Sequence, residues 1–172
     1  MEAAGYSDSN RLTLKVAVGL MDAIRNAAVV IDQQLDEIYI DLEIVNLESG
    51  EYVDIWGKMD STEAGFDMMI VHDGAGTDPN RSISFFFGTD ASANVFGFSN
   101  ERVDELCALA IATTDEAKRE EYYNECQQIC IDDCTKICLA SPMQYFVTNV
   151  SVEGFSPSAA DASNFRDTTV KQ

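Results

Sequence analysis

The stretch from His72 to Asn80 holds the residue types in this chain that are best suited to contacting a ligand. It contains the only histidine, the carboxylates of Asp73 and Asp78, and glycine and proline residues that favour a loop. The apolar run 66–71 precedes it, so we expect the loop at the carboxyl end of a strand, where open α/β sheets present ligand-contacting groups. An aspartate there could pair with a cationic amine through a charge-assisted hydrogen bond. A surface turn without a ligand would have the same composition.

Three residues of this loop, Asp78, Asp73 and His72, also have a structural interpretation. Asp78 precedes Pro79, and Asp-Pro pairs commonly begin turns, so a structural role is favoured for Asp78. For Asp73 the structural and ligand-binding interpretations are evenly balanced. A catalytic or metal-binding His72 would need a partner that the sequence does not identify, so a place on a cleft wall or on the surface is favoured.

Four of the five cysteines follow one another at intervals of four residues, at Cys126, Cys130, Cys134 and Cys138. Such a ladder could bind a metal, or one cysteine could act with His72 in a thiol enzyme or redox protein. Metal sites usually use Cys-x-x-Cys pairs from loops, whereas residues four apart share one face of a helix. We therefore favour buried core cysteines, and we expect no metal, no cofactor and no enzymatic activity.

The composition narrows the class of protein. With 172 residues, 46% hydrophobic and 24% charged, the chain is long enough for one domain with a real core. The formal net charge of −19 makes binding to nucleic acids or to anionic membrane surfaces unfavourable. No apolar run approaches the roughly 20 residues of a membrane span, and the start of the chain lacks the basic and apolar regions of a signal peptide.

The elements that must position the loop follow from the hydrophobic pattern. Residues 11–18 and 39–45 have strand character, and apolar residues at steps of three and four over 20–38 predict a helix between them. A strand, helix, strand order favours a parallel pair joined by a crossover. A short helix is expected within 48–59, and a strand buried on both faces at 66–71.

Helices dominate the expected second half. The segment 78–87 is ambiguous, and its three phenylalanines should line a core or a cleft. Helices are expected after an N-cap at Ser99 or Asn100, and after Thr113, which has capping-box spacing to Glu116. Short strands are then predicted at 137–140, 145–148 and 150–155, before a tail that is poor in core residues.

Four segments resemble one known family, and they occur along the chain in the order and spacing of that family. The most specific are GFSNERVDEL at 97–106 and TDEAKREEYY at 114–123, together with LDEIYIDLEI at 35–44 and the pairs Phe66-Asp67 and Asp78-Pro79. The chain resembles the C-terminal lobe of the extracellular solute-binding proteins, family 5, of peptide and nickel ABC transporters. The resemblance runs from about residue 5 to residue 170.

The resemblance implies an α/β fold: a periplasmic-binding-protein type II-like lobe with a mixed β-sheet flanked by helices. It implies that 1–172 form a single domain, one lobe of a two-lobed clamp, whose tail 156–172 returns to the absent N-terminal lobe. It also implies that the clamp captures a peptide or another small solute for the permease subunits of an ABC importer. The full-length protein would then be extracellular or periplasmic and anchored as a lipoprotein.

The resemblance also selects the candidate ligand-binding residues, which are Ser49, His72, Asp73, Ala75, Thr77 and Asp78. Dipeptide receptors of the family carry an aromatic residue where this chain has Ser49, and an aspartate that grips the peptide amine where it has Ala75. Val18-Gly19-Leu20 stands where they carry an arginine. These differences imply a longer peptide or another solute rather than a free dipeptide, although a shifted alignment could give Asp73 the amine-binding role.

Overall fold

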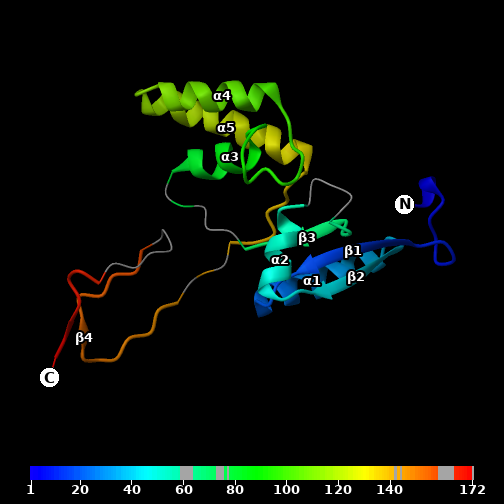
Figure 1. Cartoon of the computed structure of the whole chain (residues 1–172), viewed down its shortest axis with the longest axis horizontal. Helices are drawn as coiled ribbons and strands as arrows, with labels where there is room; N and C mark the ends of the chain where they lie inside the picture. Colours follow the sequence, from blue (N-terminus) through cyan, green and yellow to red (C-terminus); the bar gives the residue numbers. More distant parts are fainter. Residues whose placement is uncertain are drawn as a thin grey trace. The chain divides into compact units, whose positions relative to one another are not determined.

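The structure is a computed structural model that describes residues 1–58, 64–72, 76, 78–141, 143, 145–158 and 165–171. The chain divides into two units, Met1–Asp73 and Gly74–Gln172, which are considered in turn (Figure 1). Within the described residues, every helix is too short or too polar to cross a lipid bilayer.

The first unit contains a three-stranded parallel sheet in the order β2-β1-β3. After a 3-10 turn at Glu2–Ala4, its strands are β1 (Leu12–Val18), β2 (Ile40–Asn46) and β3 (Met68–Ile70). The helix α1 (Asp22–Asp36) links β1 to β2, which confirms the predicted crossover between parallel strands. A second helix, α2 (Ser49–Trp56), follows β2.

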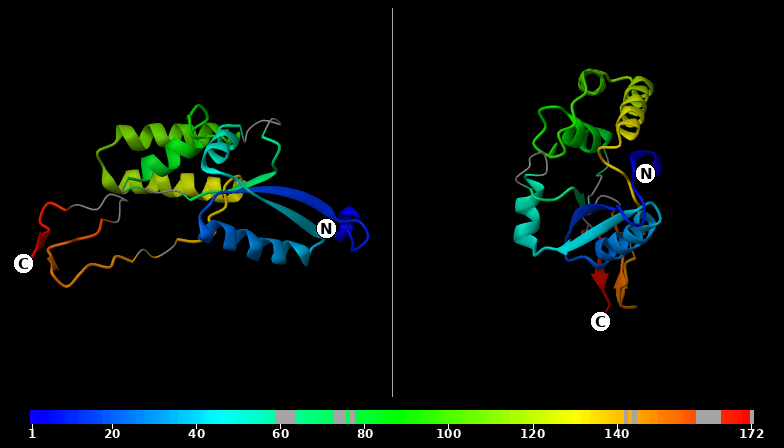
Figure 2. Two further views of the ribbon diagram at one scale, coloured as in Figure 1. Left: turned by 60° about the horizontal axis from the view of Figure 1, so that its bottom comes forward. Right: turned by 90° about the vertical axis from the view of Figure 1, so that its right-hand side faces the viewer.

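The core of this unit lies between α1 and one face of the sheet (Figure 2). Ile24 and Ala28 of α1 pack with Val16, Val18 and Leu42 of the strands. In β2, Ile40 and Leu42 are buried while the acidic residues that follow each of them are exposed, as expected for a strand with one covered face. β3 is only half-buried, because it is an edge strand; the prediction of burial on both faces was wrong.

The second unit begins with three packed helices, α3 (Pro79–Phe87), α4 (Glu101–Ala112) and α5 (Glu116–Asp133) (Figure 1). Their shared core contains Ile83, Phe98, Val103, Leu106, Cys107, Ala110, Tyr123, Cys126 and Cys130. The connection from α3 to α4 is held by Asn94, whose amide nitrogen donates to the carbonyl oxygens of Gly88 and Phe98. The ambiguous segment 78–87 is therefore a helix.

Polar side chains cap the start of each of these helices. Asn100 Oδ1 accepts hydrogen bonds from the backbone N–H groups of Arg102 and Val103, so one of the two predicted caps of α4 is confirmed. At α5 the cap is Asp115 and not the predicted Thr113. Helical geometry begins only after Asp115, so the Thr113 hydroxyl instead accepts from the Asp115 N–H.

After α5 the chain forms little regular structure. β4 (Val152–Glu153) and β5 (Thr169–Val170) make a short antiparallel pair, so the strand predicted at 150–155 is confirmed for two residues. The strands predicted at 137–140 and 145–148 do not form among the described residues. Alternating apolar residues make a strand only where a neighbour can pair with it, and these residues are exposed without one.

Candidate functional site

The carboxyl ends of the three parallel strands lie at one edge of the sheet, and Tyr52 ties α2 to that edge. Its hydroxyl donates to the Ile70 carbonyl oxygen at 2.7 Å. Its ring packs beside Gly19, where a Cβ atom would stand 3.4 Å from the ring. Burial raises the pKa of Tyr52 to about 12, so the phenol stays a neutral hydrogen-bond donor at physiological pH. These two contacts of Tyr52 bring together Gly19, which follows β1, the helix α2, which follows β2, and Ile70, the last residue of β3.

Two of the predicted ligand-binding residues lie at this edge. Ser49 is the first residue of α2 and is exposed, and His72 is exposed two positions after β3 ends. Their hydroxyl and imidazole groups can both donate and accept hydrogen bonds. The other candidates in the loop, Asp73, Ala75 and Thr77, fall outside the described residues.

The sixth candidate, Asp78, is the N-cap of α3 in the second unit. Its carboxylate accepts from the Asn80 backbone N–H at 2.8 Å and from Arg119 Nη2 of α5 at 2.7 Å. The hydrogen bond from Arg119 and that from Asn80 lower the pKa of Asp78. The structure therefore gives Asp78 the structural role that its place before Pro79 favoured.

Further polar contacts continue from this cap between α3 and α5. Asn80 Oδ1 accepts from the Ser84 hydroxyl at 2.6 Å and from the Tyr123 hydroxyl at 3.2 Å. The Arg119 guanidinium lies 5.0 Å from the centre of the Tyr123 ring, within cation–π range. Together these contacts fix the start of α3, which the 72–80 loop joins, on the first half of α5.

The cysteine ladder separates into two kinds of thiol. Cys126 and Cys130 are buried in the helical core, as predicted. For Cys134 and Cys138 the prediction of burial was wrong: Cys134 ends α5 in a left-handed conformation, and both thiols are exposed. Burial raises the pKa of Cys126 to about 12 and that of Cys130 to about 11, the opposite of what a nucleophilic thiolate requires. Across the described residues, no three His, Cys, Asp or Glu side chains are grouped to hold a metal ion.

Phe86 is buried rather than displayed on a cleft wall, while its neighbour Phe85 is exposed. Lys136 Nζ lies 3.6 Å from the centre of the Phe86 ring, a close cation–π contact. This contact holds the chain that leaves α5 against α3.

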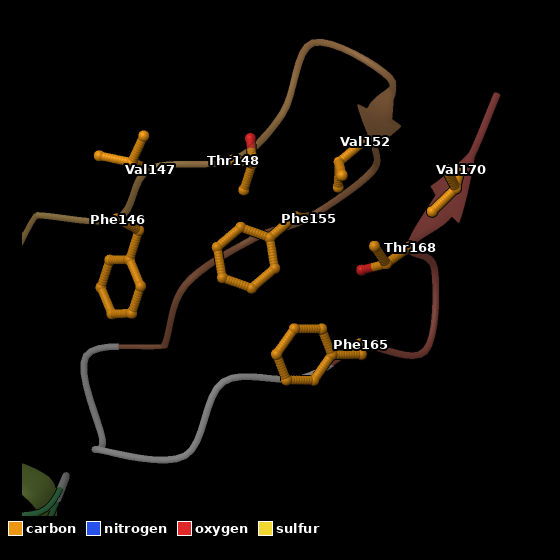
Figure 3. A pocket seen from close by; sticks show the side chains of 8 residues that line it. All are labelled: Phe146, Val147, Thr148, Val152, Phe155, Phe165, Thr168 and Val170. Atoms are coloured by element: carbon orange, nitrogen blue, oxygen red, sulfur yellow. The ribbon is translucent and has the colours of Figure 1, made fainter.

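The C-terminal segment forms an apolar pocket of about 430 Å³ (Figure 3). Phe155 lies between Phe146, at 5.8 Å, and Phe165, at 5.3 Å, measured between ring centres. The remaining lining residues come from both strands and the chain before them: Val147, Thr148, Val152, Thr168 and Val170. The Thr168 hydroxyl is buried and has no hydrogen-bond partner among the described residues.

Apolar side chains beside this pocket are unusually exposed. Tyr145 is 82% exposed, Val147 96% and Val150 99%. A pair of two-residue strands is too short to be stable alone, and an apolar surface of this kind marks a site of contact with other polypeptide. We call this surface, made of residues 145–158 and 165–170, the C-terminal apolar surface.

Comparisons with known proteins agree with this architecture. No family model matches the chain. Over 81 residues, 45% of its length, the chain is 32% identical to a protein of Escherichia coli (strain K12) described as a probable D,D-dipeptide-binding periplasmic protein, DdpA. The match covers 16% of that relative.

Several solved structures match 99% of this chain. They include the oligopeptide-binding protein AppA from Bacillus subtilis in complex with a nonapeptide (TM-score 0.77, 18% identity) and OppA from Burkholderia pseudomallei (TM-score 0.79, 17% identity). The chain spans 36% of the first and 33% of the second. The resemblance seen in the sequence is confirmed, and so is the α/β, periplasmic-binding-protein-like fold. The three-stranded sheet is wholly parallel; among the described residues, antiparallel pairing occurs between β4 and β5 and in an isolated bridge between Ser7 and Asn10.

Two of the contacts that shape these sites were not predicted from the sequence. Tyr52 lies in the segment 48–59, where a short helix was expected, but its bond to Ile70 joins parts of the chain that lie 18 residues apart. Arg119 lies 41 residues from Asp78, and nothing local marks it as the partner of that carboxylate. The tertiary fold creates both pairings.

Proposed function

We propose that this chain is one lobe of the substrate-binding component of an ABC importer and that it captures peptides without catalysing a reaction. The proposal rests mainly on the structural match to the oligopeptide-binding protein AppA, which covers 99% of this chain. The 32% identity with DdpA over 81 residues supports it. Buried thiols of raised pKa and an exposed His72 offer no support for a thiol enzyme.

In this proposal the ligand is bound at the carboxyl edge of the β2-β1-β3 sheet. Ser49 and His72 supply exposed hydrogen-bonding groups there. Asp73, Ala75 and Thr77, which follow His72 in the 72–80 loop, complete the proposed site. Asp78 acts indirectly, because its carboxylate is engaged by Arg119 and by the start of α3.

The two units together form the C-terminal lobe of a longer, two-lobed protein, as the matched shares of 33–36% of the solved relatives suggest. The tail 156–172 and the segment before it return to the other lobe, and the C-terminal apolar surface is the part that lobe covers. Its exposed valines and the aromatic pocket support this arrangement, because such a surface is unfavourable in water.

The same proposal places the full-length protein outside the cytoplasmic membrane, in the periplasm or anchored to the outer leaflet as a lipoprotein. The description of DdpA as a periplasmic protein supports an exported location. The permease subunits of the importer would receive the peptide from the closed clamp.

Calorimetry on the full-length, two-lobed protein tests the ligand class. We expect peptides of several residues to bind and to raise the melting temperature through mass action, with free dipeptides weaker. Stabilisation by another class of solute, with none by any peptide in a panel of varied length and charge, would refute the peptide part of the proposal.

A pair of variants tests the location of the site. His72→Ala should weaken peptide binding by about tenfold, the effect of losing one good hydrogen bond. Gln34→Ala is the matched control, since Gln34 is exposed near the end of α1 that is remote from the carboxyl edge. Equal affinities for the two variants would exclude His72 from the site.

Comparison of the isolated 172-residue chain with the full-length protein tests the two-lobed arrangement. We expect the isolated chain to bind peptide far more weakly and to self-associate through the C-terminal apolar surface. Equal affinity for peptide would contradict the arrangement.

A further inference from the structure

Three of the buried core residues shared by α4 and α5 are thiols. Cys107 of α4 and Cys126 and Cys130 of α5 all belong to the same core cluster. After burial itself, the neighbouring Cys107 thiol contributes to the raised pKa of both Cys126 and Cys130. Cys126 Sγ also lies 3.9 Å from the carbonyl oxygen of Val103, one turn before Cys107 on α4. Cys126 is therefore the α5 thiol that faces Cys107.

Geometry distinguishes the pairs that could be joined covalently. A disulfide needs Cβ atoms about 3.5–4.5 Å apart. Cys126 and Cys130 are four residues apart on one helix, which holds their Cβ atoms at about 5–6 Å. A bond between them would require α5 to unwind. Cys107 and Cys126 sit on different helices, so the geometry of a single helix does not fix the distance between their Cβ atoms.

We propose that Cys107 and Cys126 are a disulfide-forming pair that covalently joins α4 to α5 when the chain folds under oxidising conditions. In the structure all five cysteines are free. This inference does not depend on the peptide-binding function.

The oxidant in the proposed step is a small-molecule disulfide such as oxidised glutathione. One thiolate of the pair attacks it, forming a mixed disulfide and releasing one molecule of reduced glutathione. The second thiolate then displaces the other glutathione and completes the Cys107–Cys126 bond. Two S–H bonds are lost, one S–S bond forms in the protein, and the two electrons reduce the glutathione disulfide to two thiols.

The reaction should occur during folding rather than in the folded protein. In the folded state both thiols are buried, and burial raises the pKa of Cys126 to about 12, so very little attacking thiolate is present. The exposed Cys134 and Cys138 should react first when folded, reduced protein meets an oxidant.

Peptide mapping tests the proposal. The full chain would be refolded from denaturant in a glutathione redox buffer, its remaining thiols alkylated, and the protein digested with trypsin. Cys107 then lies in the peptide 103–118, Cys126, Cys130 and Cys134 lie in 120–136, and Cys138 lies in 137–166. We expect the first two peptides to be cross-linked, with fragmentation assigning the bond to Cys126. A fully alkylated 103–118 peptide, or a bond from Cys107 to any other cysteine, would overturn the proposal.

Matched variants keep the test independent of folding defects. Cys126→Ser should abolish the cross-link, whereas Cys130→Ser, an equally conservative change one turn away in the same core, should retain it. A Cys134→Ser, Cys138→Ser double variant should also retain it. The oxidised wild-type chain should melt about 5 °C or more above its reduced form, because the bond closes a loop in the unfolded chain. An unchanged or lower melting temperature in the cross-linked chain would count against the pair.

Discussion

At the scale of single residues, Asp78 combines two roles that substitutions can separate. Its carboxylate caps α3 and pairs with Arg119. Asp78→Asn keeps a good capping side chain but loses the ion pair, whereas Asp78→Ala loses both. We therefore expect both variants to lower the melting temperature of the helical unit, with Asp78→Ala lowering it by a few degrees more. Equal melting temperatures for the two variants would mean that the cap contributes nothing.

Because of the same carboxylate, the stability of the helical unit should depend on pH in the acid range. The folded-state pKa of Asp78 is lowered, so its contribution is present above the ordinary aspartate pKa and is lost as the pH falls through the folded value. The difference in melting temperature between wild type and Asp78→Asn should shrink as the solution is acidified. A difference that is constant with pH would show that the ion pair is not responsible.

Because of Tyr52, the stability of the first unit should fall as the pH rises in the alkaline range, the opposite direction to the effect of Asp78. Its pKa rises from an ordinary 10.0 to about 12 on folding, so the unfolded chain ionises first as the pH increases. The free energy of unfolding of the first unit should fall between those values, and less so in Tyr52→Phe, which cannot ionise. Tyr52→Phe should also cost about 0.5–1.5 kcal/mol at neutral pH, through the lost bond to Ile70.

Fluorescence of Trp56, the only tryptophan, makes this measurement specific to the first unit, because it lies on the same helix as Tyr52. Tyr145→Phe is the control, since Tyr145 is 82% exposed and lies in the second unit. Identical alkaline slopes for wild type and Tyr52→Phe would contradict the assignment.

At the scale of helices and strands, two glycines predict opposite effects of the same substitution. A Cβ atom at Gly88, which ends α3, would stand 2.7 Å from the Ser84 carbonyl oxygen, whereas one at Gly50, inside α2, would meet nothing within 4 Å. We expect Gly88→Ala to destabilise its unit by about 1–3 kcal/mol and Gly50→Ala to stabilise its own by up to about 1 kcal/mol. Urea denaturation measures both, and a stabilising Gly88→Ala would show that α3 ends differently.

The helices and strands also show what could be predicted from the sequence and what could not. The segments with long periodic patterns, β1, α1, β2 and α4, were predicted because their pattern is local. The strands predicted at 137–140 and 145–148 failed because pairing depends on a neighbour that the local sequence does not specify. At the sites, the position of His72 after a strand was predictable and Ser49 was selected only through the family resemblance, whereas the partners of Tyr52 and Asp78 were not predicted.

At the scale of the whole molecule, the surplus of 30 acidic over 11 basic residues predicts a strong effect of salt. Most basic side chains already lie beside carboxylates, including Arg11 with Asp36 and Asp41, and Arg102 with Glu105 and Glu125. The remaining negative charge repels itself in the folded state, and salt screens that repulsion. Salt also weakens the exposed ion pairs, but each of these contributes little to the free energy of unfolding.

We therefore expect the melting temperature to rise by several degrees between about 20 mM and about 500 mM NaCl. Matched solutions of a neutral osmolyte control for changes in water activity. A melting temperature that falls with salt would mean that the ion pairs outweigh the self-repulsion.

The central position of β1 in the order β2-β1-β3 also has a consequence for the route by which the first unit folds. β2 follows β1 after a single helix, whereas β3 lies more than twice as far along the chain. Because the entropy lost on closing a loop grows with its length, pairing of β1 with β2 is the less costly first step. During synthesis, that β1-α1-β2 nucleus can be complete before Met68 leaves the ribosome. The strand β3, which His72 follows, is then the last part of the described sheet to be assembled.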